Sequence, residues 1–175
     1  MIKLYTESAV EYLPYDPESC RVAGLVAKYV TNSDRGLNVE HIGSTAVAGC
    51  WGKGIIDLLV GYAPGELSSA QDALERLGFQ HRAAPEPFPE SRPMPVGNVE
   101  HLGRSYRLHA HLVARGASEA QEFLRFRDLL RQNFELRRAY EAEKRAVLAR
   151  GITAVAEYSR AKGHFIRGAL GIIEL

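Results

Sequence analysis

The feature that most constrains the fold of this chain is the almost unbroken apolar run 55–60, which contains a single charged residue, Asp57. A short apolar run of this kind is typical of a β-strand whose two faces are both covered by other elements. A carboxylate inside such a strand is costly to bury unless it is paired or bound to a metal ion. The run therefore predicts a central strand of a layered sheet and marks Asp57 as its chemically unusual position.

The periodicity of the apolar residues predicts the other elements. The predicted helices are 17–30, 67–77, 118–130, 133–150 and one beginning at 153, and the predicted strands are 37–42, 79–82, 96–102 and 106–113. The prolines of 83–95 predict a loop or lid. From about Ser118 the composition becomes basic and helical, which we interpret as a second layer of one domain spanning 1–175.

The overall composition argues against several classes of protein. A formal net charge of +1 is unlike that of a dedicated nucleic-acid binder, which is usually strongly basic. The two cysteines are too few for a disulfide framework, and no signal-peptide pattern is present, so we expect a reducing, cytoplasmic setting. No apolar run approaches the roughly 18 residues of a membrane span, so we expect no membrane association.

A glycine followed by two small hydroxyl residues, Gly43-Ser44-Thr45, stands directly after the predicted strand 37–42. If this turn opens a helix, its unpaired backbone N–H groups would point outward and bind phosphate oxygens. Glycine allows a ligand to approach the backbone closely, and the serine hydroxyl adds a donor. The pattern predicts a phosphate-binding turn, although a plain helix-capping turn has the same residues.

Asp57 lies one strand after this turn, so the carboxylate and the turn can meet at neighbouring strand ends. A Mg²⁺ ion held by one or two carboxylates and by substrate phosphates is the usual arrangement for phosphoryl or nucleotidyl transfer. The alternative is a structural aspartate that is paired with Lys53, with Arg107 or with a histidine.

Three polar residues alternate along the predicted strand 106–113 and therefore share one of its faces: Arg107, His109 and His111. Two histidines at this spacing can chelate a metal ion, contact phosphate as donors or act as general bases. The shared face with an arginine makes a functional site and a structural histidine pair equally tenable.

The helices after Ser118 carry many lysines and arginines, most of which we expect to form a solvated surface with neighbouring glutamates. Two tyrosine–lysine pairs, each with a spacing of four residues, lie on one helix face: Tyr140 with Lys144, and Tyr158 with Lys162. A few of these basic residues can line a polyphosphate groove, and Lys144, Tyr158 and Lys162 are our candidates.

The run 39–47, followed by Lys53 and by 55–57, resembles the signature of the GrpB family, small proteins of the nucleotidyltransferase superfamily. The resemblance continues in the same order through 109–111, 126–131 and the two tyrosine–lysine pairs, and so covers nearly the whole chain. Related domains occur fused to dephospho-CoA kinases, which points to nucleotide or coenzyme metabolism.

The resemblance implies an α+β fold of the nucleotidyltransferase type, in which a mixed β-sheet is flanked by helices and followed by a C-terminal helical layer. It further implies that Gly43 and Ser44 grip a triphosphate and that Asp57 is the catalytic carboxylate that binds Mg²⁺.

The chain departs from the superfamily pattern at the other carboxylates. A second carboxylate is usually found two residues after the first, where this chain has Leu59, on the same strand face as Asp57. A third is expected on a later strand, where this chain offers His109 and His111, with Glu100 as another substitute.

Two main functions are consistent with these residues. The first is a nucleotidyltransferase that moves a nucleotidyl group from an NTP to an unknown acceptor. Gly43, Ser44 and Lys53 would hold the phosphates. Mg²⁺ or Mn²⁺ would be held by Asp57 with His109 or His111; a mixed histidine and carboxylate set favours manganese or zinc.

The second function is a non-catalytic module that binds a nucleotide or coenzyme and has a degenerate metal site. A metal-dependent hydrolase or lyase that uses the two histidines is a weaker third possibility. In both main readings the partner is an NTP or another nucleotide-containing small molecule, and the sequence does not fix the oligomeric state.

Overall fold

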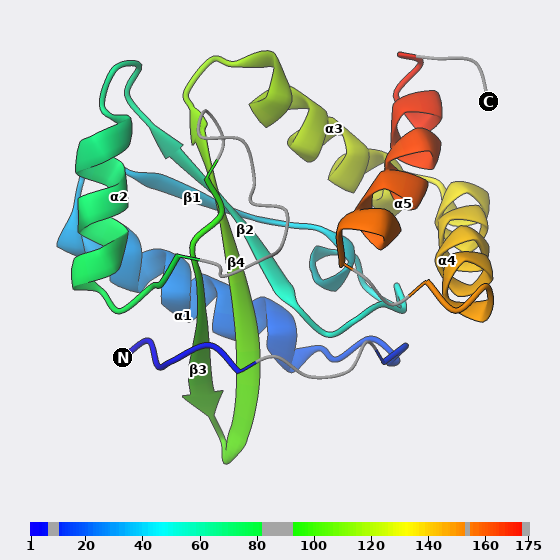
Figure 1. The fold of residues 1–175 in the computed structure, drawn as a ribbon, viewed down its shortest axis with the longest axis horizontal. Coiled ribbons are helices and arrows are strands. Elements are labelled where there is room, and N and C mark those ends of the chain that lie inside the picture. The colour runs from blue at the N-terminus through cyan, green and yellow to red at the C-terminus, as the bar shows by residue number, and fades with distance from the viewer. Residues whose placement is uncertain (7–10, 82–92, 153–154, 173–175) are drawn as a thin grey trace.

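A computed structural model describes residues 1–6, 11–81, 93–152 and 155–172 of the chain. The elements are α1 (Glu18–Ser33), β1 (Asn38–Ile42), the 3₁₀ turn η1 (Ser44–Ala46), β2 (Ile56–Tyr62), α2 (Leu67–Arg76), β3 (Val96–His101), β4 (Arg104–Ala114), α3 (Ser118–Gln132), α4 (Phe134–Ala149) and α5 (Val155–Ala169). The fold is α+β, as predicted, and helices flank a single described sheet (Figure 1).

The sheet has four strands in the order β1-β2-β4-β3 and is mixed. The central strands β2 and β4 are parallel, whereas β1 and β3 run antiparallel to their neighbours. β3 and β4, which correspond to the predicted strands 96–102 and 106–113, form a hairpin whose two-residue turn has positive φ angles at Leu102 (49°) and Gly103 (75°). Two such residues are typical of the tight turns that match the twist of a hairpin.

Both faces of β2 are covered, as its apolar sequence predicts. Ile56, Leu58 and Val60 are fully buried in a core that α1 and α2 complete on one face. On the opposite face Leu59 packs with Ile42 and with apolar residues of α3. Asp57 shares that second face, because side chains alternate along a strand.

The helical layer predicted from about residue 118 is present. α4 and α5 lie side by side at one end of the sheet, next to the segment that follows η1 (Figure 1). Val47 and Cys50 of that segment pack in one apolar cluster with Phe126, Tyr140 and Leu170. The C-terminal helices therefore face the loop between β1 and β2 and not only the sheet.

Some local predictions need correction. Ser118 and Gln121 have the spacing of a capping box, which predicts Ser118 as the cap of α3. Ser118 is instead the first residue of that helix, and the cap position is Ala117, which makes no side-chain cap. The strand predicted for 79–82 is reduced to a bridge between Gln80 and Val96. Most of the proline-rich segment and the predicted helix start at Thr153 lie outside the described residues. None of the described helices is long and apolar enough to cross a bilayer.

Candidate functional site

Asp57 is the second residue of β2, and its carboxylate is held by two histidines of the neighbouring parallel strand. In the sheet register it lies between Ile42 on β1 and His109 on β4. Its Oδ1 atom accepts a hydrogen bond from His111 Nε2 at 3.4 Å and lies 3.7 Å from His109 Nδ1. Of the structural alternatives raised by the sequence, pairing with a histidine is therefore the one that forms.

The charge state of Asp57 follows from these contacts. Burial alone raises the pKa of this carboxyl group, but the hydrogen bond from His111 and the charges of His111, His109 and Lys162 outweigh burial. Together they lower the pKa to about 2. Asp57 is therefore an ionised carboxylate at neutral pH, in an otherwise apolar strand.

The three candidate metal ligands lie together, but their atoms do not form a ligand set. Both histidine nitrogens approach the same oxygen of Asp57. In the described part of the chain no group of three or more His, Cys, Asp or Glu side chains is arranged to hold a metal ion. His109 Nε2 is also engaged, by the hydroxyl of Tyr5 at 3.0 Å. Metal binding by Asp57, His109 and His111 stays a prediction that this geometry does not support.

The positions considered for further carboxylates do not supply them near Asp57. Leu59 is 4% exposed and belongs to the apolar cluster under α3. Glu40 pairs with Leu59 in the sheet register, but its carboxylate binds Arg127 at 2.9 Å. The proposed substitute Glu100 was wrong, because it pairs with Ser105 near the turn of the hairpin, away from His109.

The turn after β1 is built to touch the carboxylate of Asp57. Gly43 has φ 72° and ψ −171°, a conformation that is essentially restricted to glycine. A Cβ atom at this position would lie 2.5 Å from Asp57 Oδ2, so no side chain fits there while the carboxylate stays in place. The turn opens only the 3₁₀ turn η1, so the helix that the sequence left open as a possibility is three residues long.

Thr45 does not serve as a phosphate donor in this arrangement. It is buried, and its hydroxyl donates to the carbonyl of Ile55 at 3.1 Å. The hydroxyl proton is thus committed, so the 3.0 Å contact with His41 Nε2 has the imidazole as donor. Burial, with the charges of Arg131 and Arg127, lowers the pKa of His41 to about 4, although Asp57 opposes this. Thr45 and neutral His41 therefore fix the turn on β2.

Ser44 instead lies next to a cation from the C-terminal helices. A Cβ atom added to Gly52 would collide with Ser44 Oγ and lie 3.7 Å from Lys144 Nζ. The absence of a side chain at Gly52 therefore lets the hydroxyl and the ammonium group come close to the same point. Lys144 is 2% exposed and donates to the carbonyl of Trp51.

Three lysines gather around tyrosines beside this turn. Lys53 Nζ lies 3.5 Å from the centroid of the Tyr158 ring, and Lys162 Nζ lies 5.4 Å from it. Lys144 Nζ lies 4.4 Å from the ring of Tyr140. Burial lowers the pKa of Lys144, and the charge of Lys162 lowers it further, so these two cations repel each other.

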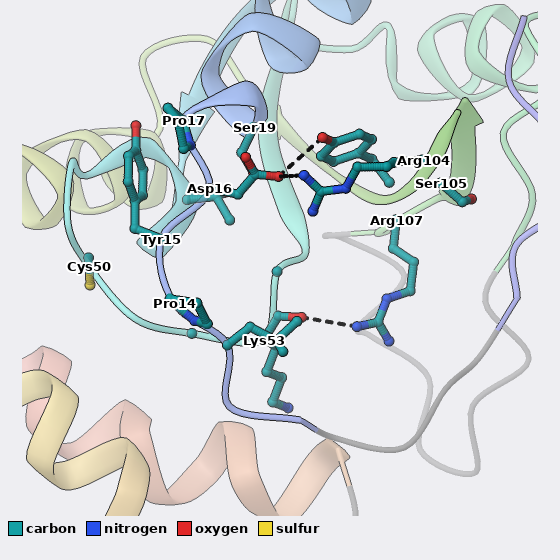
Figure 2. A pocket seen from close by; sticks show the side chains of 15 residues that line it. Pro14, Tyr15, Asp16, Pro17, Ser19, Cys50, Lys53, Arg104, Ser105 and Arg107 are labelled. Carbon is teal, nitrogen blue, oxygen red and sulfur yellow. Dashed lines mark hydrogen bonds and ion pairs between the residues drawn. The ribbon is translucent and has the colours of Figure 1, made fainter. Parts of the chain in front are cut away.

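Arg107 does not join the histidines that share its strand face. Its Nη2 donates to the carbonyl of Lys53 at 3.0 Å, and its side chain lines a separate pocket (Figure 2). The Lys53 side chain points away from this pocket, toward the C-terminal helices (Figure 2). The predicted phosphate ligands are thus divided between two sides of the segment 52–54.

The sequence did not single out the side chains that hold the turn in place. Three arginines of α3 and α4 donate to backbone carbonyls around the turn at 2.8–3.1 Å: Arg127 to His41, Arg131 to Ala46 and Arg137 to Ala48. Trp51, half exposed, stacks on Tyr12 with ring centroids 5.7 Å apart. Nothing in the spacing of the basic residues separates these arginines from those on the solvated surface.

Comparison with known proteins supports the resemblance seen in the sequence. Residues 10–171 match the family described as GrpB protein. A UPF0157 protein of Halalkalibacterium halodurans is 30% identical over 91% of this chain and 80% of its own length. One of Pseudomonas aeruginosa is 33% identical over 94% of this chain and 68% of its own length. One of Streptomyces coelicolor is 36% identical over 74% of this chain, which spans 65% of that protein's length.

Solved structures show the same fold. The crystal structure of the conserved protein GrpB from Enterococcus faecalis superposes with a TM-score of 0.71 at 22% identity, over 93% of this chain and 98% of that one. The Cid1 poly(U) polymerase, solved with Mg and 3′-dATP bound, has a similar fold, with a TM-score of 0.54 at 12% identity. That match covers 91% of this chain and 49% of Cid1. By sequence and by fold, this chain belongs to the GrpB family.

Proposed function

We propose that this protein binds a nucleoside triphosphate, or a related nucleotide-containing small molecule, at the Gly43–Ser44 turn against the lysines of α4 and α5. The observation that carries the proposal is the charge balance beside the turn. Lys144 and Lys162 repel each other, and among the described residues only the charge of Asp57 favours the protonated form of Lys162. Cations that are partly desolvated and incompletely compensated favour an anionic ligand.

Phosphate is the anion that best suits the groups at this position. The Ser44 hydroxyl and the Lys144 ammonium group both approach Gly52, whose missing side chain leaves room for that hydroxyl. A hydroxyl donor and a compact cation directed at the same position commonly bind a phosphate oxygen. On the neighbouring side of the turn, Gly43 leaves room for the Asp57 carboxylate.

The exposed aromatic side chain beside the lysines favours a nucleotide over inorganic phosphate. Trp51 is 42% exposed, lies against Tyr12, and follows directly on Cys50, whose Sγ is 3.7 Å from Lys144 Nζ. A planar base stacks well on an exposed aromatic ring, and such stacking contributes about 1–3 kcal/mol per base. A ligand with a base and a phosphate chain would use both features.

Thermal-shift titration with ATP, CTP, GTP, UTP and CoA, each with and without Mg²⁺ or Mn²⁺, tests the proposal. Ligand at about 100 times its Kd adds about 2.7 kcal/mol, which raises the Tm of a protein of this size by about 5–10 °C. Absence of a shift with every ligand, with and without metal, would refute it. Comparing titrations with and without the divalent metal shows whether nucleotide binding depends on that metal.

Matched lysine variants locate the site. Lys162→Gln removes a cation of the proposed site, and Lys28→Gln removes an exposed cation on α1. We expect Kd for the best nucleotide to rise at least tenfold in Lys162→Gln and to stay unchanged in Lys28→Gln. Equal behaviour of the two variants would contradict the placement of the ligand.

A second candidate, nucleotidyl transfer, is favoured by one observation: the ionised carboxylate of Asp57 touches the turn that would hold the phosphates. The described residues around Asp57 supply histidines and leucine where further carboxylates would be needed, so we propose no catalytic step. Release of pyrophosphate from α-labelled NTPs tests it. Turnover that is lost in Asp57→Asn would establish the transferase, and binding without turnover in either form would leave the binding module.

A further inference from the structure

A pocket lies on the other side of segment 52–54 from the lysines of α4 and α5 (Figure 2). Its volume is about 530 Å³, within the range of pockets that hold small molecules. Tyr15, Pro17 and Leu13 contribute apolar surface, and Ser105 and Arg107 contribute polar groups. Gly52 and Lys53 of the segment beside the proposed nucleotide site line this pocket as well, but Ser44, Lys144 and Lys162 do not.

The charges in the pocket do not cancel. Arg104 is paired with Asp16 at 3.0 Å, and the hydroxyl of Tyr106 also donates to Asp16 at 3.1 Å. Arg107 has no such partner among the described residues: its one hydrogen bond goes to the neutral carbonyl of Lys53. A guanidinium group has five N–H donors, so most of its donors and all of its charge remain available.

We propose that this pocket is a second binding site, which takes a small organic oxyanion, a carboxylate or a phosphate monoester, paired with Arg107. The fork of an arginine matches both kinds of oxyanion bidentately, and apolar walls beside it suit an organic body. Ser105 adds a hydroxyl that accepts from Asn98 Nδ2 at 3.3 Å and keeps its own proton for a ligand.

The two sites are separate but share a wall. Arg107 binds the carbonyl of Lys53 from the pocket side, while the Lys53 ammonium group lies over Tyr158 on the other side (Figure 2). Ser44 and Lys144 likewise meet Gly52 from the nucleotide side. An anion bound by Arg107 therefore does not occupy the lysine site, and substitutions can address one site at a time.

Two aromatic probes and one neutral control test the inference on the full chain by ligand-observed NMR titration: benzoate, phenyl phosphate and benzyl alcohol. Fragments of this size are expected to bind in the millimolar range. We expect at least one anion to bind and benzyl alcohol not to bind, and which anion binds tells carboxylate from phosphate. Failure of both anions to bind the wild-type protein would overturn the proposal.

Variants decide which site the anion occupies. Arg107→Gln keeps a donor for the Lys53 carbonyl but removes the charge. Arg115→Gln is the matched control, because Arg115 also donates to a backbone carbonyl, that of Gly36 at 2.8 Å, outside the pocket. We expect anion affinity to fall at least tenfold in Arg107→Gln and to be unchanged in Arg115→Gln and Lys162→Gln. Loss in Lys162→Gln with retention in Arg107→Gln would place the anion in the nucleotide site and refute the second site.

Discussion

Replacing Gly43 by alanine tests directly whether the turn and the carboxylate of Asp57 are fitted to each other. The added Cβ would lie 2.5 Å from Asp57 Oδ2 and 3.1 Å from Asp57 Cβ and Cγ. Contacts at these distances require either the turn or the carboxylate to move. Since the carboxylate is held by His111, movement also weakens that hydrogen bond.

The expected loss has two parts. The backbone conformation of Gly43 costs a residue with a Cβ about 1–3 kcal/mol, and overpacking against Asp57 costs about 1–3 kcal/mol more. Because alanine lowers the conformational entropy of the unfolded chain, it offsets about 0.4–1 kcal/mol of this loss in the free energy of unfolding. We therefore expect Gly43→Ala to lower the free energy of unfolding by about 1–5.6 kcal/mol.

Gly49→Ala is the matched control, because Gly49 also has a positive φ of 76° but its added Cβ would meet nothing closer than 4.0 Å. Backbone strain alone predicts a loss of about 1–2 kcal/mol there. Urea denaturation of both variants gives the comparison. If Gly43→Ala costs no more than Gly49→Ala, the steric argument fails.

The double variant Gly43→Ala/Asp57→Ala separates the two parts further. Asp57→Ala removes the carboxylate that the new Cβ would strike, so the double variant should lose less stability than the sum of the single variants. We expect a coupling of more than about 1 kcal/mol in this direction. Strict additivity would show that the two residues do not collide.

Three further predictions follow from the charges around the site. The pKa of His41 is lowered to about 4, so below pH 6.5 the unfolded chain takes up a proton at this residue and the folded protein does not. The free energy of unfolding should therefore fall by about 3 kcal/mol from pH 6.5 to 4. Urea denaturation at several pH values should show that His41→Gln abolishes this dependence. The pKa of Asp57 is lowered to about 2, so its ionised form contributes about 2 kcal/mol to the free energy of unfolding above pH 4, and this contribution is lost as the pH falls toward 2. The difference in free energy of unfolding between the wild type and Asp57→Asn should vanish between pH 4 and pH 2. Lys144→Met removes a buried cation, and burial lowers the pKa of that lysine. The rise in Tm on nucleotide binding should disappear, while the free energy of unfolding without ligand should be unchanged or higher. A loss of the Tm rise together with a lower free energy of unfolding would indicate a structural role.

Much of the fold was accessible from the sequence because it depends on local periodicity. The apolar run around Asp57 predicted a strand covered on both faces, and β2 is such a strand. The α3–α4 boundary at Asn133 was also predicted, and the side chain of Asn133 caps α4 by accepting from Leu136 N at 2.9 Å. The capping pattern at Ser118 misled, since the same residue types also occur inside a first helical turn.

The site was predicted less completely, because strand register and long-range contacts are not local properties. Alternation placed Arg107, His109 and His111 on one strand face, which fits the register, but register alone does not say where a long side chain ends. Arg107 reaches the carbonyl of Lys53, while the histidines reach Asp57. The order of turn and strand predicted that the turn meets Asp57, and the close approach of Gly43 to that carboxylate confirms it; the family resemblance supplied only the expected roles of these residues.

The positions of the site residues in the sequence determine when the site can form during synthesis of the chain. The large apolar core that covers one face of the sheet is made by residues between Ile2 and Leu112, so it does not need the C-terminal helices. Lys162, by contrast, stands on the last helix. A chain emerging from the ribosome can thus complete its sheet before it acquires its full set of cations. A ligand that binds at the turn and to Lys162 would stabilise α5 against local unfolding. It would therefore slow amide hydrogen exchange in that helix far more than in β2.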